Sequence, residues 1–206
     1  PITIFGVGMA LEKNPEICKA IIEADYEVAS HGWRWLDYQN IKRSEEKKHM
    51  KRAIQTHKKI FGKRPLGWYT GRCSPNTRDL VFEDGGFLYD SDSYSDDLPY
   101  WEMRNKKKQL IIPYTLDNND MRFVANQGFN TGDHFFTYLK DSFDALYEEG
   151  ETNPKMMSVG LHCRLIGKPG RIQSLKRFLD YILKHEDVWI CKRIDIANHW
   201  IKNYSN

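Results

Sequence analysis

Short apolar runs alternate with helix-like segments along this 206-residue chain, and this alternation limits the possible folds more than any other feature. Strand-like runs lie at residues 1–8, 26–29, 66–70, 87–91, 110–114, 156–162 and 188–191. Apolar residues recur at helical spacing in residues 14–24, 44–61, 131–149, 172–185 and 194–203, and Ser74-Pro75 begins a further short helix. Strands that alternate with helices predict an α/β fold with a parallel sheet, either open and doubly wound or closed into a barrel.

Two of the expected strands end at a histidine that stands among other reactive or aromatic residues. His31 lies in the segment Ser-His-Gly-Trp-Arg-Trp at residues 30–35, and His162 is followed by Cys163 and Arg164. Burying such groups without partners would cost a few kcal/mol each. Since the carboxyl ends of parallel strands gather at one edge, we expect both histidines to face one shared pocket.

The composition predicts one globular domain over residues 1–206. Hydrophobic residues make up 40% and charged residues 29%, and no apolar run approaches the roughly 18 residues that a membrane span needs. The formal net charge of +3 is too small to indicate a nucleic-acid partner. We therefore expect a soluble cytoplasmic protein with neither nucleic acid nor membrane as a partner.

Several kinds of site are absent from the sequence. The cysteines at positions 18, 73, 163 and 191 form no CxxC pair, which argues for reduced thiols and against a zinc ribbon. No complete glycine-rich phosphate loop, G-x-S-x-G elbow or HExxH motif occurs. We expect no cofactor.

Two segments depart from the regular alternation. The chain opens directly on an apolar strand without an initiating Met, so we expect that an N-terminal part of the natural protein is missing. Residues 92–130 form a long aromatic-rich excursion with one expected strand, and such excursions in compact domains often serve as lids.

Five sequence blocks, in order along the chain, strongly resemble the PuuE-type allantoinases, a branch of the polysaccharide deacetylase (NodB-homology) family. These blocks are residues 30–38 (SHGWRWLDY), 67–72 (GWYTGR), 86–92 (GFLYDSD), 112–123 (IPYTLDNNDMRF) and 160–167 (GLHCRLIG). The resemblance covers essentially the whole chain. It implies a distorted (β/α) barrel of the NodB type, here without its first strand, and hydrolysis of the ring amide of allantoin to allantoate.

The resemblance also bears on metal binding. Deacetylases of the family hold a divalent ion with an Asp and an H-x-x-x-H pair, but the residue four places after His31 is Trp35. Indole cannot ligate a metal. The substitution favours the allantoinase branch, which is expected to act without a metal, so we assign no metal ligand.

Opening a cyclic amide needs an activated water, donors for the oxyanion and an acid for the departing nitrogen. From the resemblance we assign the acid role to His162. For His31 we expect orientation of the water or a hydrogen bond to the oxyanion, and for Trp35 a pocket wall at the vacated ligand position. The general base is expected upstream of Pro1.

Charged residues in the same blocks are candidates for substrate binding. Arg72 and Arg164 could each donate a forked pair of hydrogen bonds to ureido or carbonyl oxygens. Asp92 and Asp120 could accept N–H groups of the substrate. We expect the small molecule allantoin as substrate and a homo-oligomer as the assembly.

Two other functions stay open. A zinc-dependent N-deacetylase of polysaccharide or peptidoglycan is the alternative enzyme. A non-catalytic deacetylase-like binding protein is the alternative if the chain is complete, because the base would then be missing.

Overall fold

The computed structural model describes residues 1–204, which divide into two compact units. The first unit comprises Pro1–Ser93, Pro99–Pro113 and the segment from Ile190 onward. The second comprises Tyr94–Leu98 and Tyr114–Trp189. The chain therefore leaves the first unit twice, briefly after Ser93 and again after Pro113, and returns to it at Pro99 and at Ile190.

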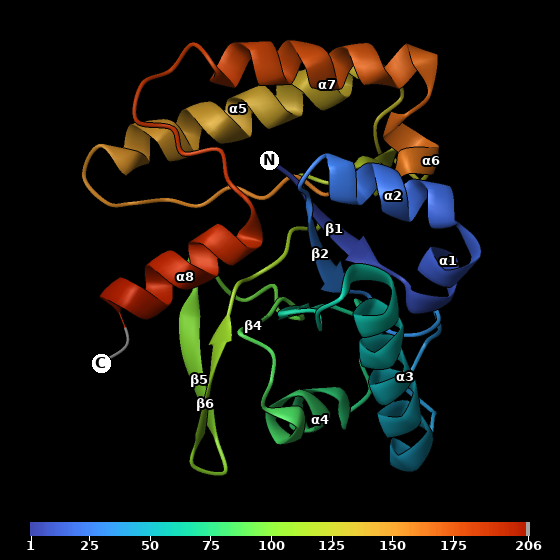
Figure 1. Ribbon diagram of the computed structural model, residues 1–206. Coiled ribbons are helices and arrows are strands. Elements are labelled where there is room, and N and C mark those ends of the chain that lie inside the picture. The colour runs from blue at the N-terminus through green and yellow to red at the C-terminus, as the bar shows by residue number, and fades with distance from the viewer. Residues whose placement is uncertain (205–206) are drawn as a thin grey trace. The chain divides into compact units, whose positions relative to one another are not determined.

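One sheet organises the first unit. Within residues 1–204 it has six strands in the order β1-β2-β3-β4-β6-β5, and Figure 1 shows β5 and β6 side by side. The strands are β1 (Thr3–Gly6), β2 (Glu27–Ser30), β3 (Gly67–Trp68), β4 (Tyr89–Asp90), β5 (Tyr100–Arg104) and β6 (Lys107–Ile111). Neighbours from β1 through β4 to β6 are parallel, and β5 pairs antiparallel with β6. The α/β prediction with a parallel sheet is confirmed.

The helices of this unit are α1 (Gly8–Lys13), α2 (Pro15–Glu23), α3 (Arg43–Phe61), α4 (Thr77–Asp84) and α8 (Arg193–Asn203). Local sequence explains several of their ends. Pro15 occupies the first turn of α2, where its missing N–H costs nothing. Gly62 ends α3 with φ of 70°, a left-handed conformation that glycine adopts without strain. The predicted helices that correspond to α2, α3 and α8 are confirmed.

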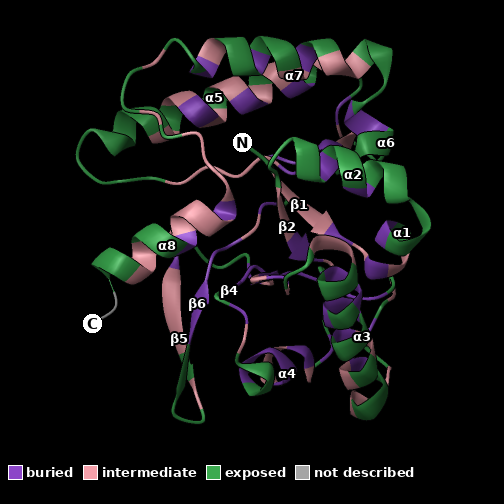
Figure 2. Cartoon of the chain, in the orientation of Figure 1, coloured by how far each residue is buried: buried purple, intermediate pink, exposed green. Residues whose placement is uncertain are grey.

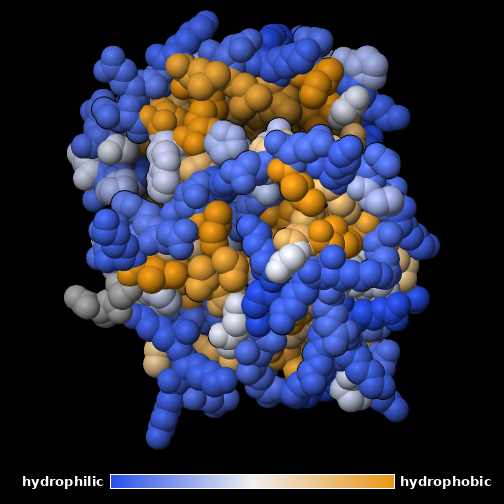
Figure 3. All heavy atoms as spheres, viewed as in Figure 1, coloured by the Kyte–Doolittle hydropathy of each residue, from blue (hydrophilic) through white to orange (hydrophobic). Residues whose placement is uncertain are grey.

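The core of this unit lies where α3 and α4 meet the sheet. Apolar side chains from these elements form one buried cluster of Met50, Ile54, Trp68, Leu80, Val81 and Phe87. Figure 2 shows β4 buried, while β6 is exposed at Lys107 and Lys108 and buried over residues 109–111. Helix α3 alternates between buried and exposed sides. In Figure 3 hydrophilic residues cover most of α3, and hydrophobic residues gather at the surface between α2 and α3. The periodicity of α3 thus placed its apolar stripe correctly.

The second unit is built on two long helices. It contains the 3₁₀ helix η1 (Asp120–Phe123), α5 (Gly132–Gly150), the short α6 (Cys163–Ile166) and α7 (Pro169–Ile182). Helices α5 and α7 pack on each other. Aromatic rings fill their surroundings, with Phe129 and Phe135 at 5.5 Å between ring centroids and Phe143 and His185 at 4.9 Å. In the part of the chain from 1 to 204, no helix is long and apolar enough to cross a bilayer.

Two strand predictions are wrong. Residues 156–162 form no strand but a single isolated bridge between Gly160 and Asn119, because the partner segment turns at once into η1. Residues 188–191 are also outside any strand. Both runs are apolar, but a strand requires a neighbour whose N–H and C=O groups stay in register over several residues.

The excursion at residues 92–130 is more regular than the sequence indicated. It contains the β5–β6 hairpin, whose turn places Asn105 and Lys106 at positive φ. Strand β6 spans Lys107–Ile111, so it begins and ends three residues earlier than the strand predicted at 110–114. The expected lid function of this excursion stays a prediction.

Candidate active site

The loop after β2 lies against the end of β1. The N–H of His31 donates to the carbonyl of Gly6 at 2.9 Å, and the N–H of Gly8 donates to the carbonyl of Gly32 at 2.9 Å. Gly32 has φ of 71°, so a glycine is needed for the chain to turn here. The His31 ring lies 5.1 Å from the ring of Tyr69. The prediction that His31 follows a strand end is confirmed.

Trp35 and Arg72 form a pair beside this loop. The Arg72 guanidinium lies 4.5 Å from the centroid of the Trp35 ring, within the range of a cation–π interaction. Trp35 is 48% exposed and contributes to a shallow cavity of about 530 Å³. The other lining residues are Val7, Met9, Ala10, Lys13, Asn14 and Arg34. A wall position for Trp35 agrees with this geometry, and contact with a substrate stays a prediction.

Asp92 is a half-buried residue whose carboxylate contacts the backbone of the neighbouring loop. The N–H of Thr70 lies 2.9 Å from each of its oxygens, and the N–H of Gly71 donates to Oδ1 at 2.7 Å. Burial raises the pKa of Asp92, and these two hydrogen bonds partly oppose the rise. The carboxylate is therefore occupied by protein donors.

Asp90 and Arg78 lie in the site region, but the sequence interpretation gave neither of them a specific role: it counted Asp90 only among the possible acid/base carboxylates and did not name Arg78. Asp90 is fully buried, and burial together with the neighbouring Asp92 charge raises its pKa to about 7. The Arg78 Nε lies 3.5 Å from Asp90 Oδ2, and its Nη1 donates to Glu102 at 2.8 Å. The signal available in the sequence was the pair of acids two positions apart, Asp90 and Asp92, at a strand end. Arg78 left no such signal, because it lies on a helix.

In the second unit, Asp120 and His162 form a hydrogen-bonded pair. Asp120 is 0% exposed, and its Oδ1 lies 2.7 Å from Nδ1 of His162. Its Oδ2 accepts the backbone N–H of His162 at 2.8 Å and that of Ile166 at 3.1 Å. We assign a proton to Nδ1 from this contact, since the carboxylate can only accept. The Nε2 atom is then left for other partners.

His162 lies at the start of α6 and not at a strand end. The extended residue His162 is the N-cap of this short helix. The expected strand-end position of His162 is therefore wrong, because residues 156–162 pair with their neighbour only at Gly160. The Arg164 side chain, two residues on, lies 3.7 Å from the sulfur of Met121.

The predicted site residues fall into two groups. His31, Trp35, Arg72 and Asp92 belong to the first unit, and Asp120, His162 and Arg164 belong to the second. Within the first group Arg72 contacts Trp35, and within the second Asp120 contacts His162. A pocket shared by His31 and His162 stays a prediction.

The donor set does not fit the metal that the family resemblance implies for deacetylases. Among residues 1–204, no cluster of three or more His, Cys, Asp or Glu side chains is arranged to hold an ion. Trp35, four residues after His31, offers an indole where a metal site needs an imidazole. We derive no step through a metal.

Known proteins resemble this chain over nearly its whole length. The sequence profile of the family Polysaccharide deacetylase matches residues 1–81. A Schizosaccharomyces pombe protein, provisionally named a polysaccharide deacetylase, is 43% identical over 97% of this chain and 68% of its own length. The chain belongs to the polysaccharide deacetylase family.

Two solved structures are similar to this chain in both fold and sequence. A crystal structure from Pseudomonas aeruginosa PAO1, provisionally named a polysaccharide deacetylase, has a TM-score of 0.97 and 55% identity, with 99% of this chain and 69% of that chain covered. The crystal structure of Puue allantoinase also has a TM-score of 0.97, with 56% identity and coverage of 99% and 68%. The chain thus has the α/β fold of the NodB type, as predicted, and is a hydrolase of this family.

Proposed function

We propose that this hydrolase opens the cyclic amide of allantoin to give allantoate, a step of purine breakdown. The observation that carries the proposal is the pair of Asp120 and His162, in which a fully buried carboxylate holds Nδ1 of an imidazole at 2.7 Å. Such a pair suits general acid catalysis, because the carboxylate stabilises the protonated ring and fixes its direction. The 56% identity to Puue allantoinase supports the choice of substrate.

The proposed chemistry is addition of water followed by loss of the ring nitrogen. Water adds to the amide carbon while a base takes one of its protons, and a tetrahedral intermediate with a negatively charged oxygen forms. The carbon–nitrogen bond then breaks, and Nε2 of protonated His162 gives its proton to the departing nitrogen. No residue in the range 1–204 is assigned as the base that accepts the proton of the water.

The other predicted residues have supporting roles in the proposal. His31 orients the water or donates to the oxyanion, and Trp35 forms a wall of the pocket. Arg72 and Arg164 bind the ureido and carbonyl oxygens through their guanidinium groups, which suit planar polar substrates. Asp120 acts on His162 and is not assigned a contact with substrate.

A second candidate is an N-deacetylase of polysaccharide or peptidoglycan. It is favoured by the names of the curated relatives, which include the Schizosaccharomyces pombe protein at 43% identity. The two activities differ in their products, since one gives allantoate and the other gives acetate. They also differ in the expected response to zinc, because the deacetylase alternative requires a bound ion.

The test is to incubate the purified protein with allantoin and follow allantoate, and in parallel to incubate it with N-acetylated chitin and peptidoglycan oligomers and follow acetate. We expect allantoate in an amount that chelator does not reduce. Acetate release that depends on stoichiometric zinc would favour the deacetylase. Binding without either product would favour a non-catalytic protein. The homo-oligomer and the cytoplasmic location stay predictions, and size-exclusion chromatography with light scattering tests the first.

A further inference from the structure

One loop of the first unit carries two side chains that meet the predicted site residues. Tyr69, at the start of residues 69–72, lies 5.1 Å from the His31 ring, and Arg72, at the end, lies 4.5 Å from the Trp35 ring. The carbonyl of Arg72 also accepts the N–H of Tyr38 at 3.1 Å. The path of this loop therefore determines where both aromatic contacts are made.

The carboxylate of Asp92 fixes the middle of the loop. It accepts the N–H groups of Thr70 and Gly71 at 2.7–2.9 Å, between the two residues whose side chains reach the site. The Cys73 side chain also hydrogen-bonds to Asp92. Hydrogen bonds to an ionised acceptor are about twice as strong as neutral ones, so the charge of Asp92 is well suited to hold the backbone.

The loop makes a tight turn at Gly71. Gly71 has φ of 67°, and a Cβ placed there would lie 2.7 Å from the hydroxyl of Tyr69. The Thr70 hydroxyl accepts the N–H of Arg72 at 3.1 Å, which tightens the turn. The chain thus turns back toward Tyr69, and a residue with a side chain at position 71 would be strained.

Asp92 is itself held in place from two sides. Its N–H donates to Asp90 Oδ1 at 2.9 Å, and its carbonyl accepts a hydrogen bond from Arg78 at 2.6 Å. Arg78 in turn pairs with Glu102 on β5. The clamp is thus anchored to the helix and hairpin next to β4.

We propose that Asp92 is a positioning residue that holds residues 70–71 so that Arg72 and Tyr69 reach the site, in place of the substrate contact predicted from sequence. Its effect on catalysis rests on the proposed function of the chain. The residue acts through the backbone and through Arg72, and does not touch the substrate.

The test compares Asp92→Asn, Arg72→Ala and the double variant in allantoin hydrolysis. The Asn side chain would face the N–H groups of Thr70 and Gly71 either with its NH₂ group, which cannot accept, or with a neutral oxygen, which accepts more weakly. The hydrogen bonds that hold residues 70–71 would therefore be lost or weakened. We expect KM to rise by about 10- to 100-fold in Asp92→Asn, as misplacement of a binding group implies. Because Asp92 acts partly through Arg72 and partly through Tyr69, the effect of the double variant on KM should be clearly smaller than the product of the two single effects.

The matched control is Asp84→Asn. Asp84 also pairs with an arginine, Arg64, and accepts a backbone N–H, that of Gly86 at 3.2 Å, but it lies at the end of α4. We expect its KM to match that of the unaltered protein. Unchanged KM in a folded Asp92→Asn variant, or fully multiplicative effects in the double variant, would overturn the proposal.

A readout without turnover separates this proposal from the proposed function. By NMR, Asp92→Asn should speed hydrogen exchange of the Gly71 amide at least tenfold and move the indole N–H resonance of Trp35, identified with Trp35→Phe. These changes are expected even if the unaltered protein gives no allantoate. Identical exchange and an unmoved resonance would overturn the positioning role. If Asp92→Asn does not fold, Gly71→Ala disturbs the same loop directly and should give the same KM rise and the same Trp35 shift, and their absence would count against the proposal.

Discussion

At the scale of single residues, buried charged and polar groups carry most of the information about function. Asp120 has no solvent exposure, and both of its carboxylate oxygens accept hydrogen bonds from the segment that begins α6, including one from Nδ1 of His162. A buried carboxylate without such partners would be costly. Its three hydrogen bonds therefore stabilise the charge and orient the His162 ring at the same time.

The His162 ring is expected to be necessary for turnover. In the proposed reaction His162→Ala removes the acid and should lower kcat by about 10²- to 10⁴-fold. Asp120→Asn should lower kcat by a smaller factor, because the ring remains but loses its orienting charge. Steady-state kinetics with allantoin measure both.

The matched control for this pair is His134→Ala, in the same unit and on the exposed first turn of α5. It should keep its kcat. Undiminished turnover in a folded His162→Ala variant would remove His162 from the mechanism.

His57 gives a prediction on pH and stability. It is 1% exposed on α3, its Nε2 has no hydrogen-bond partner, and burial lowers its pKa to about 4 from 6.5. A lowered folded-state pKa means that the stability is fully present above pH 6.5 and is lost as the pH falls toward 4. We expect the free energy of unfolding to decrease by a few kcal/mol over this range because of His57.

Chemical denaturation at several pH values measures this effect. In His57→Phe, which keeps the site apolar, the decrease between pH 6.5 and pH 4 should be clearly smaller than in the unaltered protein. If the free energy of unfolding fell equally with pH in the two proteins, the titration of His57 would not be the cause of the decrease.

At the scale of elements, helices were predicted better than strands. Of the stripe that the spacing indicated on α3, Met50, Ala53, Ile54 and His57 are buried, while Phe61 at its end is only half-buried. A helix satisfies its own backbone hydrogen bonds, so its local sequence suffices to identify it. The run at 156–162 looked equally regular but met its partner only at Gly160, which local sequence could not reveal.

Two glycines at helix ends should respond oppositely to alanine. Gly62 has φ of 70° and no atom within 4 Å of the position that a Cβ would take, so Gly62→Ala should destabilise by about 1 kcal/mol through backbone strain alone. Gly150 also has open space for a Cβ but has no positive φ and lies in the last turn of α5. Gly150→Ala should be neutral or stabilising by up to about 1 kcal/mol.

Thermal unfolding of the two variants side by side checks this pair. A loss of stability at Gly150 equal to that at Gly62 would mean that the removal of glycine, and not the left-handed conformation, is responsible.

At the scale of the whole molecule, the last helix of the chain closes the first unit against its first strands. The N–H of Arg193 donates to Thr3 Oγ1 at 2.8 Å, and the N–H of Ile194 donates to Glu27 at 2.9 Å. The Arg193 side chain, itself buried, donates to the carbonyls of Ile112 and Pro113 at 3.0 and 2.8 Å. Residues about 190 positions apart are thus joined at one point of the sheet.

Arg193→Ala should therefore loosen the C-terminal helix. The change leaves the carbonyls of Ile112 and Pro113 without their donor, and we expect a loss of about 2–4 kcal/mol in the free energy of unfolding. Urea denaturation measures the loss, and limited proteolysis should release a fragment that contains α8.

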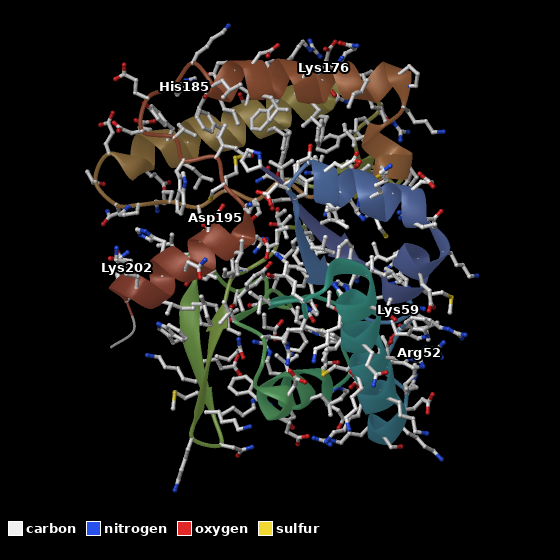
Figure 4. All side chains as sticks on the ribbon, viewed as in Figure 1. Arg52, Lys59, Lys176, His185, Asp195 and Lys202 are labelled. Atoms are coloured by element: carbon white, nitrogen blue, oxygen red, sulfur yellow. The ribbon has the colours of Figure 1, made fainter. Side chains whose placement is uncertain are left out.

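Lys202→Ala is the control for this change. Lys202 lies exposed near the end of α8 (Figure 4), and its removal should alter stability by no more than about 0.5 kcal/mol. Equal stability of the two variants would mean that the contacts of Arg193 contribute little to holding α8.

The sequence by itself determined the α/β class, most helices, the strand before His31 and the family, because these depend on periodicity and on short motifs that are read locally. It also identified Asp92, Asp120 and His162 as candidates. Only the tertiary structure decided which groups these residues contact, since Asp120 and His162 are 42 positions apart and Asp92 and Thr70 are 22 apart. A hydrogen bond depends on distance and direction in space, and residues far apart along the chain acquire both only when the backbone between them has folded.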